Sequence, residues 1–140
     1  MIRQASRADR PRIFEIRLAV RENHLSNPKA VAAVADWLFD HSTFWVWEAD
    51  GAIQGFSAAD PREGSIFALF VHPAYEGRGI GRALLPLACD VLREAGHATA
   101  VLTTDPGTRA ERFYRTDGWT EVGRQDDGQI VFRKSLLEAK

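Results

Sequence analysis

Apolar positions along the chain follow two periods, one typical of helices and one typical of strands. Apolar residues three or four positions apart predict helices, and runs rich in aromatic and β-branched residues that end at turn residues predict strands. The expected strands are residues 1–5, 43–49, 52–59, 65–71, 98–104, 119–124 and 129–136. The expected helices run from near residue 9 to near 23, from 27 to near 41, from the segment after residue 81 to 96, and from 105 to near 118.

The connections between these elements indicate how the strands pair. Asp50-Gly51 and the turn at residues 61–64 join three consecutive strands into an antiparallel unit, and a turn at residues 126–128 closes a final hairpin. The strand at 98–104 follows the strand at 65–71 through a helix, so these two should run parallel with a right-handed crossover. The order is strand, two helices, three strands, helix, strand, helix and two strands. It predicts an α/β fold, more closely an α+β fold with a mixed sheet.

Composition narrows the classes of function. The 140 residues fit one domain, residues 1–140, which is long enough to bury a core. A net charge of -1 argues against a nucleic-acid partner, because such binding usually leaves a strongly basic face. The single cysteine, Cys89, excludes an internal disulfide and lies in an apolar helical pattern, where packing is favoured over a nucleophilic role. Since no signal-peptide h-region and no apolar run of membrane length occurs, we expect a cytoplasmic protein that binds no membrane.

The segment between the strand at 65–71 and the next helix carries glycines at alternate positions. It reads Glu76-Gly77-Arg78-Gly79-Ile80-Gly81-Arg82. Because glycines leave the approach open, the backbone N–H groups of such a loop can converge on an anion, and the helix start adds about half a positive charge. The segment therefore predicts a phosphate site, with an ordinary turn as the alternative.

Two motifs in this order of elements resemble the GNAT superfamily of acyl-CoA N-acyltransferases, and the resemblance covers essentially the whole chain. The first is the strand end Phe70-Val71-His72-Pro73, followed by the glycine loop. The second is residues 109–119, which carry Ala110, then Phe113-Tyr114, then Gly118-Trp119. Two motifs at the expected separation are far more specific than a glycine loop alone.

Two positions depart from the pattern of this family. Glu76 stands where the family's loop usually has Gln or Arg, which puts a carboxylate near the expected pyrophosphate. Because backbone amides hold the phosphates, we expect Glu76 to turn outward. Gly107 stands where the family often has Asn, so the contact of that Asn is either absent or supplied by Thr108.

The resemblance implies acetyl-CoA as a co-substrate and no metal. The pyrophosphate would bind the loop amides, and the pantetheine arm would insert where the two parallel strands splay apart. A backbone N–H of the strand at 65–71 would polarise the thioester carbonyl. The implied cofactor-binding residues are Leu69, Phe70, Val71, Gly77, Arg78, Gly79, Ile80, Gly81 and Arg82.

The resemblance also assigns Tyr114 the role of general acid toward the leaving CoA thiolate. A phenol with a pKa of about 10 is a weaker acid than a thiol with a pKa of about 8.5, so we expect Tyr114 chiefly to donate a hydrogen bond. The acceptor amine must lose a proton, since an amine with a pKa of about 10.4 is almost wholly charged at neutral pH. The candidate bases are Glu22, Glu48 and His72. Glu22 ends the first helix, which borders the acceptor pocket in this family, and could also attract a cationic substrate.

Two functions follow from the resemblance. The first is an acetyl-CoA-dependent N-acetyltransferase that acts on a primary amine of an unidentified small molecule or peptide by direct attack in a ternary complex. The alternative is a non-catalytic acyl-CoA-binding sensor on the same fold, which Glu76 and Gly107 keep open and Tyr114 disfavours. A homodimer is a further open alternative, because the closing hairpin offers unpaired edges. A group of tryptophans could line an aromatic acceptor pocket, with core packing favoured: Trp37, Trp45 and Trp47.

Overall fold

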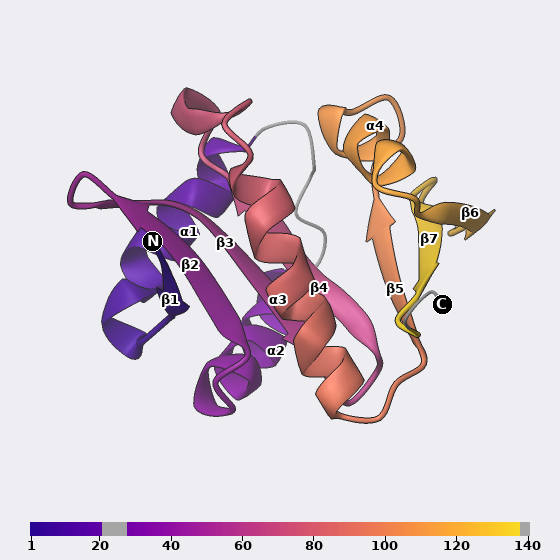
Figure 1. Cartoon of the computed structure of the whole chain (residues 1–140), viewed down its shortest axis with the longest axis horizontal. Helices are drawn as coiled ribbons and strands as arrows, with labels where there is room; N and C mark the ends of the chain where they lie inside the picture. The colour runs from indigo at the N-terminus through magenta and orange to yellow at the C-terminus, as the bar shows by residue number, and fades with distance from the viewer. Residues whose placement is uncertain (21–27, 138–140) are drawn as a thin grey trace.

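A mixed β-sheet runs through the molecule (Figure 1). The computed structural model describes residues 1–20 and 28–137, and every element named here lies within these ranges. The strands are β1 (Ile2–Gln4), β2 (Phe44–Ala49), β3 (Ala52–Asp60), β4 (Ser65–Val71), β5 (Thr99–Thr104), β6 (Thr120–Arg124) and β7 (Ile130–Ser135). Their order across the sheet is β1-β2-β3-β4-β5-β7-β6, so the closing hairpin lies beside β5.

The helices cover both faces of this sheet. They are α1 (Arg10–Ala19), α2 (Pro28–Asp40), α3 (Ile80–Glu94) and α4 (Arg109–Thr116), with short 3-10 turns at Arg7–Asp9 and Pro73–Tyr75. One hydrophobic cluster joins α1 and α2 to β2 and β3, and a second joins α3 to β5, β7 and α4. Within the described ranges, no helix combines the length and the apolar character needed to cross a bilayer.

The only parallel pair in the described part of the sheet is β4 with β5, and it separates almost at once. Its register contains a single residue pair, Ser65 with Val101, whereas β4 pairs with β3 along its whole length. The amide of Val101 also donates to the carbonyl of Gly64 at 3.1 Å. Beyond this point the strands diverge toward their carboxyl ends, which leaves a wedge between the two halves of the sheet (Figure 1). The splayed parallel pair and the order of elements confirm the predicted fold.

Two helix boundaries differ from those that the sequence pattern predicted. The first helix ends at Ala19, before the expected residue 23, because Val20 adopts an extended conformation. The last helix begins at Arg109 rather than at residue 105, because Gly107 has a left-handed φ of +75° and Thr108 caps the helix instead. The hydroxyl of Thr108 accepts a hydrogen bond from the amide of Glu111 at 3.2 Å, as expected of an N-cap residue.

Gly55 in β3 fixes how closely α3 approaches the sheet. A Cβ atom at this position would lie 2.9 Å from Cγ2 of Ile80 and 3.1 Å from the carbonyl oxygen of Phe70. Only glycine therefore allows the first turn of α3 to pack directly on β3 and β4. This contact determines where the glycine loop before α3 lies relative to the wedge.

Candidate active site

The glycine loop forms one wall of a cavity of about 370 Å³ beside the wedge. Gly77 and Gly79 have φ angles of +78° and +80°, a region that residues with a Cβ atom seldom adopt, and Gly79 is the N-cap of α3. Ile80, Gly81 and Arg82 line the cavity from the first turn of the helix. Since first-turn N–H groups have no partner inside their own helix, this end of α3 is suited to binding an anion.

Charged side chains from both sides of the wedge meet at this cavity, which we call the loop cavity. Glu76 precedes α3 and Arg109 begins α4, and Nη1 of Arg109 lies 3.7 Å from Oε2 of Glu76. Both residues line the loop cavity, as does Arg82. The carboxylate that departs from the family pattern thus faces a guanidinium at the loop cavity, instead of turning outward as expected from the sequence. Arg78 instead lies over the ring of Tyr75, 5.3 Å from its centroid.

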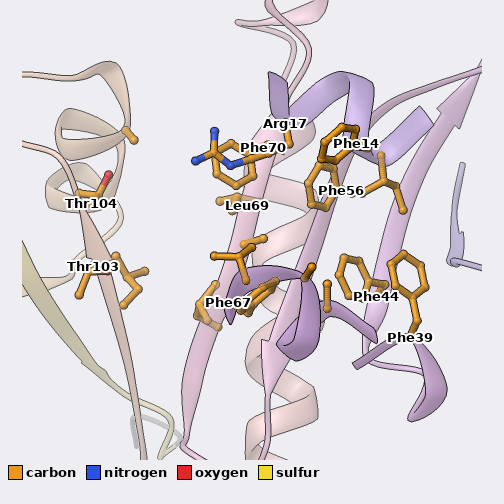
Figure 2. Close-up of a pocket in the computed structure, with 18 of the residues that line it drawn as sticks. Phe14, Arg17, Phe39, Phe44, Phe56, Phe67, Leu69, Phe70, Thr103 and Thr104 are labelled. Carbon is orange, nitrogen blue, oxygen red and sulfur yellow. The ribbon is translucent and has the colours of Figure 1, made fainter. Parts of the chain in front are cut away.

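A second and larger cavity, of about 610 Å³, lies between α1, α2 and the sheet. Figure 2 shows aromatic side chains from several elements that surround it, with Thr103 and Thr104 of β5 across the gap. Its aromatic lining contains six phenylalanines: Phe14, Phe39, Phe44, Phe56, Phe67 and Phe70. We call this space the phenylalanine cavity. Volumes of this size are typical of small-molecule sites.

The two cavities meet at four residues that line both of them. These are Leu69 and Phe70 at the end of β4, and Ala110 and Tyr114 on α4. The shared residues lie on either side of the wedge, so a molecule in the loop cavity and one in the phenylalanine cavity can touch here. An arrangement with two chambers and one common point suits a reaction between two substrates.

Tyr114 is buried among aromatic side chains at this meeting point. Its ring packs against Phe113, Trp119 and Phe132, with centroids 5.3, 5.8 and 6.0 Å away. Burial, together with the negative charge of Asp117, raises the pKa of the Tyr114 phenol above its ordinary value. The hydroxyl therefore stays protonated near neutral pH and can donate a hydrogen bond.

The candidate bases are placed differently from Tyr114. Nδ1 of His72 accepts a hydrogen bond from the amide of Ala74 at 3.0 Å, and His72 is not among the described residues that line either cavity. Glu48 pairs with Arg3 at 3.2 Å, on the strand far from the wedge. Glu22 lies outside the described residues. The assignment of a base to Glu22 or His72 stays a prediction.

Sequence reasoning missed Arg17, Arg109 and the phenylalanines. Arg17 lines the phenylalanine cavity, and helical spacing from Ile13, four residues earlier, puts it beside the apolar face of α1. A charged residue beside the apolar stripe of a helix was the sequence feature that could have identified Arg17.

The tryptophans that were considered for an acceptor pocket are absent from the described lining: Trp37, Trp45 and Trp47. Trp37 stacks on His41 instead. Among the described residues, no three His, Cys, Asp or Glu side chains gather in a way that could hold a metal ion.

The fold and site together define an α/β protein in which a cavity at a glycine loop and an apolar cavity share four lining residues. The family model described as "Acetyltransferase (GNAT) family" matches residues 10–119. The chain therefore belongs to the GNAT acetyltransferase family. This membership confirms the family that the two sequence motifs resemble.

Relatives and solved structures agree with this assignment. The peptidyl-lysine N-acetyltransferase YiaC of Escherichia coli is 34% identical over 142 residues, which cover 93% of this chain and 91% of YiaC. A mycothiol acetyltransferase of Sanguibacter keddieii is 36% identical over 111 residues, or 72% of this chain. The match spans only 35% of the length of that relative. The structure of YncA from Salmonella typhimurium, which contains its cofactor acetyl-CoA, is similar in fold, with a TM-score of 0.78 at 21% identity over 100% of this chain and 95% of YncA.

Proposed function

We propose that this chain transfers an acetyl group from acetyl-CoA to a primary amine of a small molecule or peptide, by direct attack in a ternary complex. The observation that carries the proposal is the meeting of the two cavities at Leu69, Phe70, Ala110 and Tyr114. A transfer between two substrates requires that both be held together, and orientation alone can lower the barrier by several kcal/mol.

The loop cavity suits acetyl-CoA. Its glycine wall and the N-terminus of α3 would bind the pyrophosphate through backbone amides, with Arg82 as nearby positive charge. The edge of β4 from Leu69 to Val71, which faces the wedge, would receive the pantetheine arm. Acetyl-CoA in the related fold of YncA supports this choice of co-substrate.

The chemistry needs few side chains. The amine nitrogen attacks the thioester carbonyl carbon, the new C–N bond forms as the C–S bond breaks, and CoA leaves as a thiolate. The amine gives up one proton and the thiolate gains one, so the reaction balances. A backbone N–H of β4 would stabilise the developing oxyanion, and the protonated phenol of Tyr114 would donate a hydrogen bond to the sulfur as negative charge develops there. The proton of the ammonium form would pass to Glu22, His72 or water.

Cys89 supports direct attack over a covalent enzyme intermediate. It belongs to α3 and is buried in the hydrophobic cluster on that helix, and burial raises the pKa of its thiol to about 11. The thiolate is the nucleophilic form of cysteine, so a thiol with this pKa is nearly unreactive at neutral pH.

A thiol-release assay with acetyl-CoA and a panel of amines tests the proposal. The panel contains free amino acids, lysine-containing peptides, polyamines and aminoglycosides. Release of CoA that depends on both protein and amine is the expected result. Tight binding of CoA without turnover on any amine would instead favour the alternative, an acyl-CoA-binding sensor on this fold.

A further inference from the structure

The residues that line the phenylalanine cavity restrict the chemistry of the acceptor that it can bind. Its six phenylalanine rings favour an apolar guest, because burial of apolar and aromatic surface is the dominant source of affinity in such sites. The charged residues in the described part of the lining are Arg10 and Arg17. No aspartate or glutamate occurs among those described lining residues. The described lining therefore offers positive charge to an anionic group of the acceptor.

The two arginines have different surroundings. Arg10 forms an ion pair with Asp36 of α2 and lies over the ring of Phe39. Arg17 is half-buried, and its guanidinium carbon lies 4.5 Å from the centroid of the Phe70 ring. Figure 2 shows Arg17 lying against Phe70, with its guanidinium directed toward the gap between β4 and β5. Of the two arginines in the described lining, Arg17 is thus the one that lies against a residue shared by both cavities.

The surroundings of Arg17 suit a carboxylate ligand. Burial lowers the pKa of this guanidinium, which means that its charged form is poorly solvated, although the charge of Asp105 acts in the opposite direction. In such a setting a charge-assisted hydrogen bond to a carboxylate is stronger than at an exposed surface, and a guanidinium can bind a carboxylate through two parallel bonds.

The position of Arg17 further restricts which acceptors can react. Phe70 lines both cavities, so a carboxylate bound at Arg17 lies close to the site of attack on the thioester. The amine must reach that site at the same time. An α-amino acid carries its amine and its carboxylate on one carbon. Its side chain can extend away from both groups into the phenylalanine cavity.

We propose that the acceptor is a free α-amino acid with an apolar, preferentially aromatic, side chain, whose carboxylate binds the guanidinium of Arg17. The inference rests on the proposed function and names its substrate class. It separates this chain from the relative that is named for peptidyl-lysine, because a lysine side chain within a peptide offers no carboxylate near its amine.

Matched amines test the substrate class in the thiol-release assay. L-Phenylalanine should be acetylated with a kcat/KM at least about tenfold above that of phenethylamine, which lacks the carboxylate, and above that of L-alanine, which lacks the ring. A peptide with an internal lysine should be a poorer acceptor than L-phenylalanine. Equal or better turnover of phenethylamine would overturn the inference.

Variants test the role of Arg17. Arg17→Gln should raise the KM for L-phenylalanine about tenfold or more, leave the KM for acetyl-CoA within about twofold, and abolish the preference for L-phenylalanine over phenethylamine. Arg17→Lys should restore part of that preference. Arg7→Gln, which removes an exposed arginine just before α1 that pairs with Asp40, is the matched control and should behave as wild type. An equal loss on both amines in Arg17→Gln would contradict a carboxylate contact.

A binding measurement distinguishes failure of this substrate class from failure of the proposed function. N-Acetyl-L-phenylalanine should bind the wild-type protein in the presence of CoA, by calorimetry, and bind Arg17→Gln about tenfold more weakly. Turnover on lysine peptides or polyamines, without binding or turnover of apolar amino acids, would overturn the inference and leave the proposed function intact. Absence of turnover on every amine would overturn both.

Discussion

The carboxylate of Glu76 and the guanidinium of Arg109 lie 3.7 Å apart and connect the two halves of the sheet across the mouth of the loop cavity. Glu76 belongs to the segment between β4 and α3, whereas Arg109 begins the helix that follows β5. A Cβ atom on Gly77 would lie 3.6 Å from Nη2 of Arg109, so the guanidinium is held directly beside the glycine loop. Arg109 thus supplies a counter-charge for the acidic residue that departs from the family's loop pattern.

Charge removal on either side of this pair should have opposite effects on acetyl-CoA binding. Glu76→Gln should leave the Kd equal or lower it by up to about fivefold, because one carboxylate near the phosphates is lost. Arg109→Gln should raise the Kd by a similar factor. Calorimetry at low and at physiological salt measures both, and the differences should shrink as salt rises.

Glu94→Gln is the control for this prediction, since it makes the same change of net charge at the far end of α3. It should leave the Kd unchanged. A large loss of affinity in Glu76→Gln would mean that Glu76 acts mainly by holding Arg109 in place.

The hydroxyl of Tyr114 should matter for chemistry and little for binding. Tyr114→Phe keeps the ring that packs against Trp119 and Phe132 but removes the donor. We expect kcat to fall by about 100-fold, while the Kd for CoA stays within about twofold. Single-turnover kinetics and calorimetry separate the two quantities. Unchanged turnover in a variant with wild-type Tm would remove Tyr114 from the mechanism.

The glycine loop and the Phe113-Tyr114 motif could be predicted because each is local. Glycines at alternate positions between a strand and a helix have a direct conformational meaning, and Gly77 and Gly79 indeed adopt left-handed φ angles. The contact of Arg109 with Glu76 could not be predicted, because it depends on how far β4 and β5 diverge. Divergence is a property of the whole sheet, and β4 and β5 keep only the Ser65–Val101 pair in register.

The lining of the phenylalanine cavity was harder to predict, because it too depends on how distant segments pack together. The tryptophans were considered because they cluster in sequence, with core packing favoured, yet the phenylalanines surround the cavity because strand alternation and helix packing bring them to one face. The start of α4 was also predicted wrongly from the sequence pattern. Asp105 and Pro106 are typical of a helix start, but the conformation of Gly107 delays the helix until Thr108 can cap it.

The buried thiol of Cys89 should make the protein less stable at high pH. Its pKa is raised from 9.0 to about 11 in the folded state, so the folded protein binds this proton more tightly than the unfolded chain. The resulting stability is fully present below about pH 9 and is lost as the pH rises through 11, with a total of about 3 kcal/mol. Urea unfolding between pH 7 and 11 measures this loss.

Cys89→Ala is the comparison for the alkaline series. It should lower stability at neutral pH by removing buried sulfur, but its free energy of unfolding should fall less steeply above pH 9 than that of the wild type. Tyr114 contributes in the same direction, because burial also raises the pKa of its phenol. Identical slopes in the two proteins would show that Cys89 is not the titrating group.

Gly55 should couple the stability of the sheet to cofactor binding. Gly55→Ala forces a methyl group against Ile80 and the carbonyl oxygen of Phe70, so α3 must shift away from β3. We expect a loss of about 1–3 kcal/mol in the free energy of unfolding, as for other overpacked sites, together with weaker binding of acetyl-CoA because the glycine loop moves with α3. Gly123→Ala is the matched control: a Cβ atom at Gly123 in β6 has nothing within 4 Å, and the change should cost less than about 0.5 kcal/mol. Weaker binding in Gly55→Ala that persists under conditions where the variant is fully folded would establish that the position of α3, and not global stability, sets the affinity of the loop.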